Sequence, residues 1–248
     1  MVKGTLALVK KVALLLLLLM VQMTMPVKAQ MLIGTAGMMN TPTADMFDEG
    51  TFVGGVSFVP KEMELTSGKY NTGIYYVDFT PFSWMELTFR ETLLKTTKEE
   101  NGKVKRGYYQ QDRSTTLRLR PIAEKDSTWL PSVAVGVNDI YSDHGSSRYT
   151  CVYGVLTKHF PVAAAGVVGV SAGYARRFDT GVVYNGAFGS IEFRPSFFDK
   201  LRLMAEWDTS GFNFGAHAHL VKHLNVMLFT REFKSVGAGV SYQYTIRY

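Results

Sequence analysis

From about residue 50 onward, the chain alternates apolar and polar residues along most of its length. In the stretch 114–120, Thr115, Leu117 and Leu119 alternate with serine, threonine and arginine. Side chains of a β-strand point to opposite faces in turn, so this period of two predicts strands rather than helices. Turn residues divide the pattern into twelve predicted strands, at 51–59, 72–80, 84–95, 107–120, 132–141, 148–160, 166–178, 183–194, 200–208, 211–221, 223–233 and 236–248.

Every predicted strand has one continuous apolar face, which fits two all-β architectures. A soluble sandwich or lipocalin-like barrel would turn these faces inward, whereas a transmembrane barrel would turn them toward lipid. In lipid a sheet must close so that every backbone group is paired, and an even number of strands of about 9–11 residues suits a bilayer. Aromatic residues gather near the predicted strand ends, as in an interfacial girdle: Phe82, Trp84, Trp129, Tyr141, Phe160, Phe197, Phe198 and Tyr248. We therefore predict a transmembrane antiparallel β-barrel of about twelve strands, with the soluble all-β protein as the alternative.

The first 29 residues have the pattern of a secretory signal peptide. Residues 1–11 are basic, and residues 12–21 form an apolar run of about ten residues, which is short of the roughly 20 that a spanning helix needs. We expect cleavage after Ala29. The predicted organisation is a signal peptide at 1–29, a segment at 30–50 that lies in the lumen or the periplasm, and a barrel at 51–248. The predicted location is the outer membrane of a Gram-negative bacterium.

Charge and cysteine content exclude several classes of protein. The formal net charge is +6, but four lysines and no acidic residue lie in the predicted signal, which leaves 23 basic against 21 acidic residues. A basic surface for nucleic acid is therefore not indicated. Cys151 is the only cysteine, so an intramolecular disulfide and a multi-cysteine zinc site are excluded.

The connections between predicted strands follow barrel conventions only in part. With both termini in the periplasm, the outer loops at 60–71 and 96–106 are long and the inner turn at 81–83 is short. The inner connection at 121–131 is long as well, and the last outer turns, near Thr209 and Ser235, are tight. A skipped or split strand would explain these exceptions.

The polar strand faces predict the lining of the lumen. The candidates are charged residues and two histidines: Glu86, Arg90, Arg118, Arg120, Glu192, Arg194, Arg202, Glu206, His217, His219 and Arg247. Mixed charges of this kind can pair across strands and close the lumen, or they can line a path for a hydrated polymer. The residues alone leave both interpretations open.

Three patterns resemble catalytic or metal sites without meeting their requirements. His217 and His219 share a face with His223 close by, but a zinc site needs three or four ligands. Ser171 lies in a G-V-S-A-G stretch, yet a nucleophile elbow requires a strand-to-helix turn. Glu86 and Glu192 would need a defined separation to act as a glycosidase pair. We predict no catalytic residue, no metal site and no cofactor.

The chain ends on a strand with an aromatic last residue. Tyr244, Ile246 and Tyr248 alternate with polar residues, and Arg247 is expected at the lumen or rim. We interpret the three apolar side chains as a lipid-facing signal that the outer-membrane assembly machinery reads.

Three stretches of the chain resemble a known family. The first is GTAGMMNTPTADMFDEGTF, with Pro42, Thr43, Ala44 and an acidic-Gly turn, and the others are residues 114–145, with Leu130-Pro131, and residues 188–208. They resemble the YjbH family of outer-membrane β-barrel proteins linked to exopolysaccharide and capsule biosynthesis. Asp45 departs from the family pattern, where a basic residue is expected. Larger members are several times longer, so the chain is similar to a single barrel unit.

The resemblance implies a function in surface polysaccharide export. We expect a conduit or a structural component in secretion or assembly of an exopolysaccharide or capsule, and not an enzyme. The implied partners are outer-membrane lipid, the surface polysaccharide and its export proteins, with no nucleic acid. The alternatives are a general pore for small solutes and an outer-membrane enzyme acting on lipid or glycan.

Overall fold

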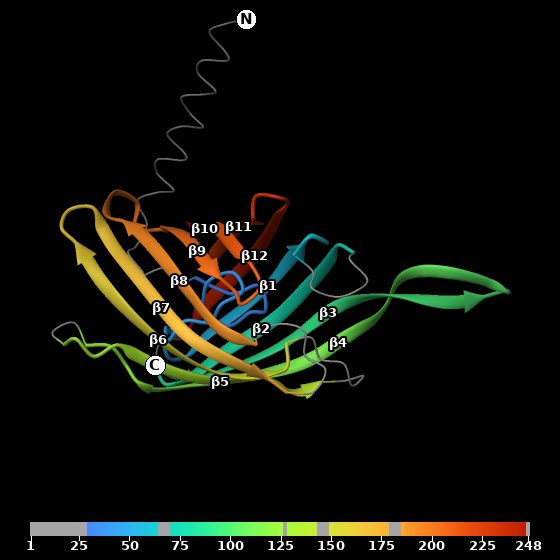
Figure 1. Ribbon diagram of the computed structural model, residues 1–248, viewed down its shortest axis with the longest axis horizontal. Helices are drawn as coiled ribbons and strands as arrows, with labels where there is room; N and C mark the ends of the chain where they lie inside the picture. The colour runs from blue at the N-terminus through green and yellow to red at the C-terminus, as the bar shows by residue number, and fades with distance from the viewer. Residues whose placement is uncertain (1–28, 64–69, 126–127, 143–148, 179–184, 247–248) are drawn as a thin grey trace, which may run out of the picture.

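The predicted barrel is confirmed in a computed structural model, which describes residues 29–63, 70–125, 128–142, 149–178 and 185–246. All neighbouring strands are antiparallel, and β1 pairs with both β2 and β12, so the sheet closes on itself (Figure 1). The twelve strands are β1 (Thr51–Val59), β2 (Thr72–Phe82), β3 (Met85–Glu100), β4 (Lys103–Ile122), β5 (Ser132–Ser142), β6 (Cys151–Val162), β7 (Gly166–Arg177), β8 (Gly186–Pro195), β9 (Leu201–Trp207), β10 (Phe212–Val221), β11 (Leu224–Arg231) and β12 (Val236–Thr245). A short 3₁₀ helix, Ser196–Phe198, connects β8 to β9. The described residues include no helix long and apolar enough to cross a membrane.

The strand order gives the barrel two distinct ends. At one end β1 begins and β12 finishes, and the connections β2–β3, β4–β5, β6–β7, β8–β9 and β10–β11 lie there. We call it the turn end. The opposite end, the hairpin end, carries the remaining connections. At the seam of the barrel, the N–H of Ile246 donates to the carbonyl of Gly50 at 3.0 Å, so pairing of β1 with β12 continues to the rim of the turn end.

The outer face of the barrel is apolar. Along β1, Phe52, Val56 and Phe58 are exposed, whereas Val53 and Ser57 are buried inside. An apolar exterior on a closed sheet is the arrangement that lipid requires. Rings also collect at the turn end, where Phe82 and Trp84 stack with centroids 5.3 Å apart and Trp129 is exposed. Tyr248 lies outside the described residues.

One predicted loop is instead a hairpin that projects beyond the barrel (Figure 1). β3 continues to Glu100 and β4 starts at Lys103, so the loop expected at 96–106 is wrong. The turn is Asn101–Gly102, with φ values of 54° and 70°, as a two-residue hairpin turn demands. Residues 97–106 are exposed on both strands, so they lack the apolar alternation by which strands were recognised.

The connection between β4 and β5 shows neither a skipped nor a split strand in the residues that the structure describes. No further strand is assigned to its described residues, 123–125 and 128–131. The segment is fixed at the turn end, because the Glu124 N–H donates to Ser132 Oγ at 2.8 Å and Lys158 Nζ donates to the Thr128 carbonyl at 2.8 Å.

Residues 29–50, which we call the plug, run inside the ring of strands and reach its rim at the exposed residues Asp48 and Glu49 (Figure 1). Met31, Ile33, Met38 and Met39 are all at most 1% exposed. The plug is a compact series of turns with two isolated bridges, Gln30–Ala36 and Gly37–Pro42. Its glycine at position 34 has φ of 105°, and a Cβ there would meet the ring of Tyr76 at 2.7 Å. The protein's own chain therefore occupies much of the interior of the barrel.

Candidate functional site

A buried carboxylate of β9 binds the middle of the plug. Glu206 accepts the backbone N–H groups of Met39, Asn40 and Thr41 at 3.2, 2.8 and 2.9 Å, and also the Thr41 hydroxyl at 2.8 Å. Asn213 Nδ2 donates to the same carboxylate at 2.8 Å. Successive N–H groups that converge on one anion form a nest. The predicted lumen residue Glu206 is thus placed against the plug.

A second carboxylate supports this contact from the turn between β9 and β10. Asp208 accepts Nδ2 of Asn40 at 2.9 Å and Nδ2 of Asn213 at 2.8 Å, and it pairs with Arg231 at 3.0 Å. Burial acts to raise the pKa of Asp208, but Arg231 and the amide donors outweigh it, so its pKa lies below the ordinary value. Asp208 was placed in a strand by the sequence pattern, but no function was predicted for it.

Arg118 of β4 holds the other part of the plug. Its Nη1 donates to the Ala36 carbonyl at 2.6 Å and pairs with Glu86 at 2.6 Å, while Nη2 donates to the carbonyls of Thr43 and Asp45. Glu86 in turn accepts the Ala36 N–H at 2.6 Å. Both charged side chains are fully buried. The structure therefore places these two predicted lumen residues in a plug contact and not beside open space.

A buried ion pair involves a partner that the strand pattern did not indicate. Arg90 pairs with Asp139, and its guanidinium lies 4.3 Å from the centre of the Tyr149 ring. Strict alternation along β5 would turn Asp139 outward, but its φ of 58° is left-handed and lets the carboxylate point inward beside Asn138. A local change of backbone conformation of this kind has no signal in a period-two pattern.

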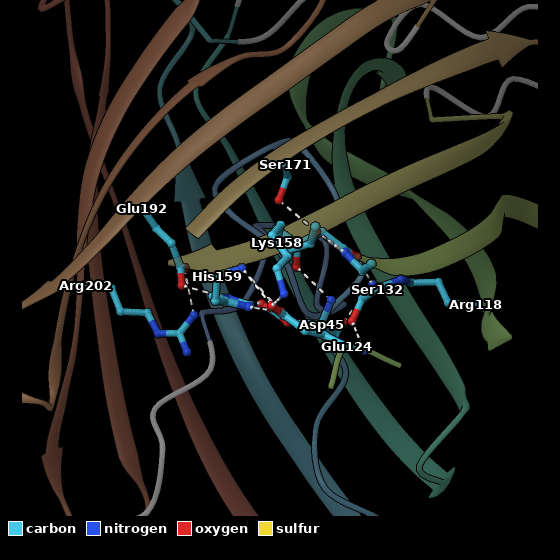
Figure 2. A network of polar contacts seen from close by, with 12 residues as sticks. Asp45, Arg118, Glu124, Ser132, Lys158, His159, Ser171, Glu192 and Arg202 are labelled. Carbon is cyan, nitrogen blue, oxygen red and sulfur yellow. Dashed lines mark hydrogen bonds and ion pairs between the residues drawn. The ribbon is translucent and has the colours of Figure 1, made fainter. Parts of the chain in front are cut away.

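The plug brings Asp45 into a polar cluster at the turn end (Figure 2). His159 Nε2 lies 3.4 Å from Asp45 and 3.6 Å from Glu192, and its Nδ1 is hydrogen-bonded to Glu124 at 2.7 Å. Lys158 pairs with Glu124 at 2.6 Å, and Arg202 pairs with Glu192 at 2.8 Å. The cluster thus joins the plug, β6, β8, β9 and the connection between β4 and β5.

A cavity of about 580 Å³ opens beside this cluster. Three cationic side chains line it, Arg120, Lys158 and Arg194, against two carboxylates, Asp45 and Glu124. A volume of this size is within the range of roughly 300–1,000 Å³ that is typical of ligand sites. The cavity is the candidate binding site of the protein.

Asp45, His159 and Glu192 are also the one group of three potential metal ligands among the described residues, with donor atoms within 4.8 Å of one another. Glu192 and Glu124 already pair with Arg202 and Lys158, and two further arginines line the cavity. This surplus of positive charge disfavours a divalent cation.

Glu124, which lies outside the strands, contributes to the pH dependence of the cluster. Burial acts to raise its pKa, but hydrogen bonds from Lys158 and His159 lower it below the ordinary value. A carboxyl group whose pKa is lowered in the folded protein stabilises the fold at pH values above its unfolded-state pKa, about 4.3. This stabilisation is lost as the pH falls through the folded-state pKa. We expect Glu124→Gln to lower the free energy of unfolding by about 0.5–1 kcal/mol at pH 7, allowing for solvent screening, and by less at pH 3.

Urea unfolding of both proteins at pH 7, 5 and 3 measures this difference. Glu99→Gln, on the exposed hairpin, is the matched control and should behave as the wild type at each pH. A deficit of Glu124→Gln that is equally large at pH 3 would contradict the role of the ionised carboxylate.

The remaining predicted residues are placed as follows. His217 is buried, whereas His219 is partly buried and hydrogen-bonded to Asn225 at 2.8 Å. His223 instead bonds to the Gln243 carbonyl at 2.8 Å. Tyr244 and Ile246 are exposed. Arg247, at the end of the chain, lies outside the described residues, as do the predicted signal peptide to residue 28 and Tyr248.

The closed antiparallel sheet and its apolar exterior define an outer-membrane β-barrel protein. A family model described as "YjbH: Exopolysaccharide biosynthesis protein YbjH" matches residues 29–247. The chain therefore belongs to the YjbH family, and the resemblance found in the sequence is confirmed. A search of curated proteins finds no match.

Two solved structures are similar in fold to the chain. Outer membrane phospholipase A from Escherichia coli shares 11% identity, with a TM-score of 0.33 over 81% of this chain and 97% of that chain. The Salmonella typhi outer membrane phospholipase (OMPLA) dimer with bound calcium shares 12% identity, with a TM-score of 0.34 over 78% and 90% of the two chains. Likenesses this low indicate nothing about activity.

Proposed function

We propose that this protein is a closed outer-membrane component of exopolysaccharide or capsule secretion in a Gram-negative bacterium, with its turn end facing the periplasm. The observation that carries the proposal is the plug, whose backbone is bound by Glu206, Glu86 and Arg118. A lumen filled in this way supports a structural component of secretion and not a conduit. A conduit for the polysaccharide would require the plug to leave the lumen.

The plug also argues against a general pore for small solutes. A cavity of about 10 Å³, roughly the space of one water molecule, lies between Gln30 and the inner faces of β2 and β10–β12. Hydrated ions need a continuous aqueous path. The described interior here is packed with buried methionines and paired charges.

The contacts of the candidate catalytic groups support a function without catalysis. Ser171 lies in mid-strand and bonds to the Thr157 hydroxyl at 2.8 Å, which itself accepts the Ala44 N–H at 2.7 Å. Glu86 and Glu192 are paired separately, with Arg118 and Arg202. These groups hold the plug and the strands together. Absence of enzymatic activity stays a prediction.

Deletion of the gene from its native host, with polysaccharide in the medium and on the cells measured as total sugar, tests the proposal. We expect a marked loss of surface polysaccharide, restored by the wild-type gene. Purified protein in planar bilayers is expected to show no steady ion current. Normal polysaccharide in the deletion strain would contradict the secretion function, and a steady wild-type current would support the pore instead.

A further inference from the structure

We propose that the cavity at the turn end binds the carboxylate of an acidic sugar, so that the polymer handled by this barrel is an anionic polysaccharide. The inference rests on the proposed function for the polymer class and on the charges of the cavity for the acidic group. It assigns a ligand to the space beside Asp45, Arg120 and Arg194.

The first step is that one arginine of the cavity has hydrogen-bond donors without an acceptor in the protein. The side chain of Arg194 forms no hydrogen bond or ion pair within the part of the chain that the structure describes, and its buried Nε lacks a hydrogen-bond partner. Buried donors normally find an acceptor, since leaving one unmade costs free energy. A guanidinium that lines a cavity without a protein acceptor is therefore suited to an acceptor from a ligand.

The second step is that the carboxylates of the cavity already have other partners. Glu124 pairs with Lys158 and His159, and Asp45 lies beside His159 Nε2. Arg120 uses Nη2 on the Ser83 carbonyl at 2.6 Å, but its buried Nε has no partner. Two arginines on one cavity thus retain donors, and guanidinium groups bind carboxylate or phosphate with paired N–H donors.

The third step concerns the size and the polarity of the space. A volume of about 580 Å³ exceeds the space of an inorganic anion and suits a short oligosaccharide, because ligand sites of this class span roughly 300–1,000 Å³. The Ser132 hydroxyl and the apolar surface of Val167 and Pro161 line the same space, and sugars present both hydroxyls and apolar ring faces. The combination favours a charged sugar over a free anion.

Calorimetric titration of the full-length protein in detergent with trigalacturonate tests the inference. We expect binding to the wild type that weakens with added salt. Arg194→Gln is expected to weaken it about tenfold or more, the order that one charge-assisted hydrogen bond supplies. Arg176→Gln, which replaces an exposed arginine near the hairpin end of β7, is the matched control and should bind as the wild type does.

Three outcomes would overturn the inference: no binding of trigalacturonate, equal binding of the neutral trisaccharide maltotriose, or undiminished binding by Arg194→Gln. Inorganic phosphate that binds with the same dependence on Arg194, while trigalacturonate does not, would assign the site to phosphate. If Arg194→Gln fails to fold, Arg120→Gln is the second variant for the titration. The proposed function fails separately, since it is contradicted by normal polysaccharide in the deletion strain, whatever the titration shows.

Discussion

Replacing Arg118 by alanine is expected to lower the free energy of unfolding of the barrel by about 3–5 kcal/mol, the usual cost of breaking a buried ion pair. The variant would leave the Glu86 carboxylate buried without its partner, and it would remove donors from three plug carbonyls, those of Ala36, Thr43 and Asp45. Urea unfolding from lipid vesicles measures the loss.

A double variant separates the charge from the plug contacts. Glu86→Gln combined with Arg118→Ala should lose less stability than the sum of the single variants, because no uncompensated charge remains buried. Arg176→Ala, at an exposed position, is the control and should change stability little. An Arg118→Ala protein as stable as this control would show that the pair of Arg118 and Glu86 adds no net stability to the barrel.

Replacing Glu206 by alanine is expected to loosen the plug and to produce ion current where the wild type has none. Three consecutive backbone N–H groups of the plug, those of residues 39–41, would lose their acceptor in a buried place. Each such unmade hydrogen bond costs about 1–3 kcal/mol. Single-channel recording in planar bilayers measures the effect as bursts of conductance.

The control for this experiment is Glu232→Ala, at an exposed turn between β11 and β12, which should stay silent. Glu206→Gln retains one acceptor oxygen and should give fewer openings than alanine. If Glu206→Ala shows no ion current and its plug remains protected from protease, the hydrogen bonds from the plug to Glu206 do not hold the lumen closed.

The strands were predictable because the alternation that indicates each strand lies within the residues of that strand. In β1 or β9, every second residue is apolar over the full width of the barrel, and lipid selects for that pattern on the outer face. The hairpin strands at 97–106 are exposed on both faces, so the same rule missed them there. The Asn101–Gly102 pair was the signal that could have corrected the prediction.

The candidate site was much less predictable, because its parts are joined only by packing inside the lumen. Asp45 departs from the family pattern in the sequence, and nothing in its neighbours indicates that it meets His159 and Glu192 across the lumen. Long-range contacts of this kind carry no local pattern. Arg120 and Arg194 were predicted on polar strand faces, but their shared cavity depends on where the β4–β5 connection lies.

The direct join between the plug and β1 has a kinetic consequence. Gly50, with φ of 78°, turns the chain from the plug into Thr51, and its N–H donates to the Thr80 carbonyl at 2.9 Å. A displaced plug would stay attached to the rim at an effective concentration on the order of millimolar. Rebinding would then be intramolecular and fast, so any passage through the lumen would last only while a ligand or partner held the plug away. A plug displaced from the lumen would therefore return to it without the help of another component.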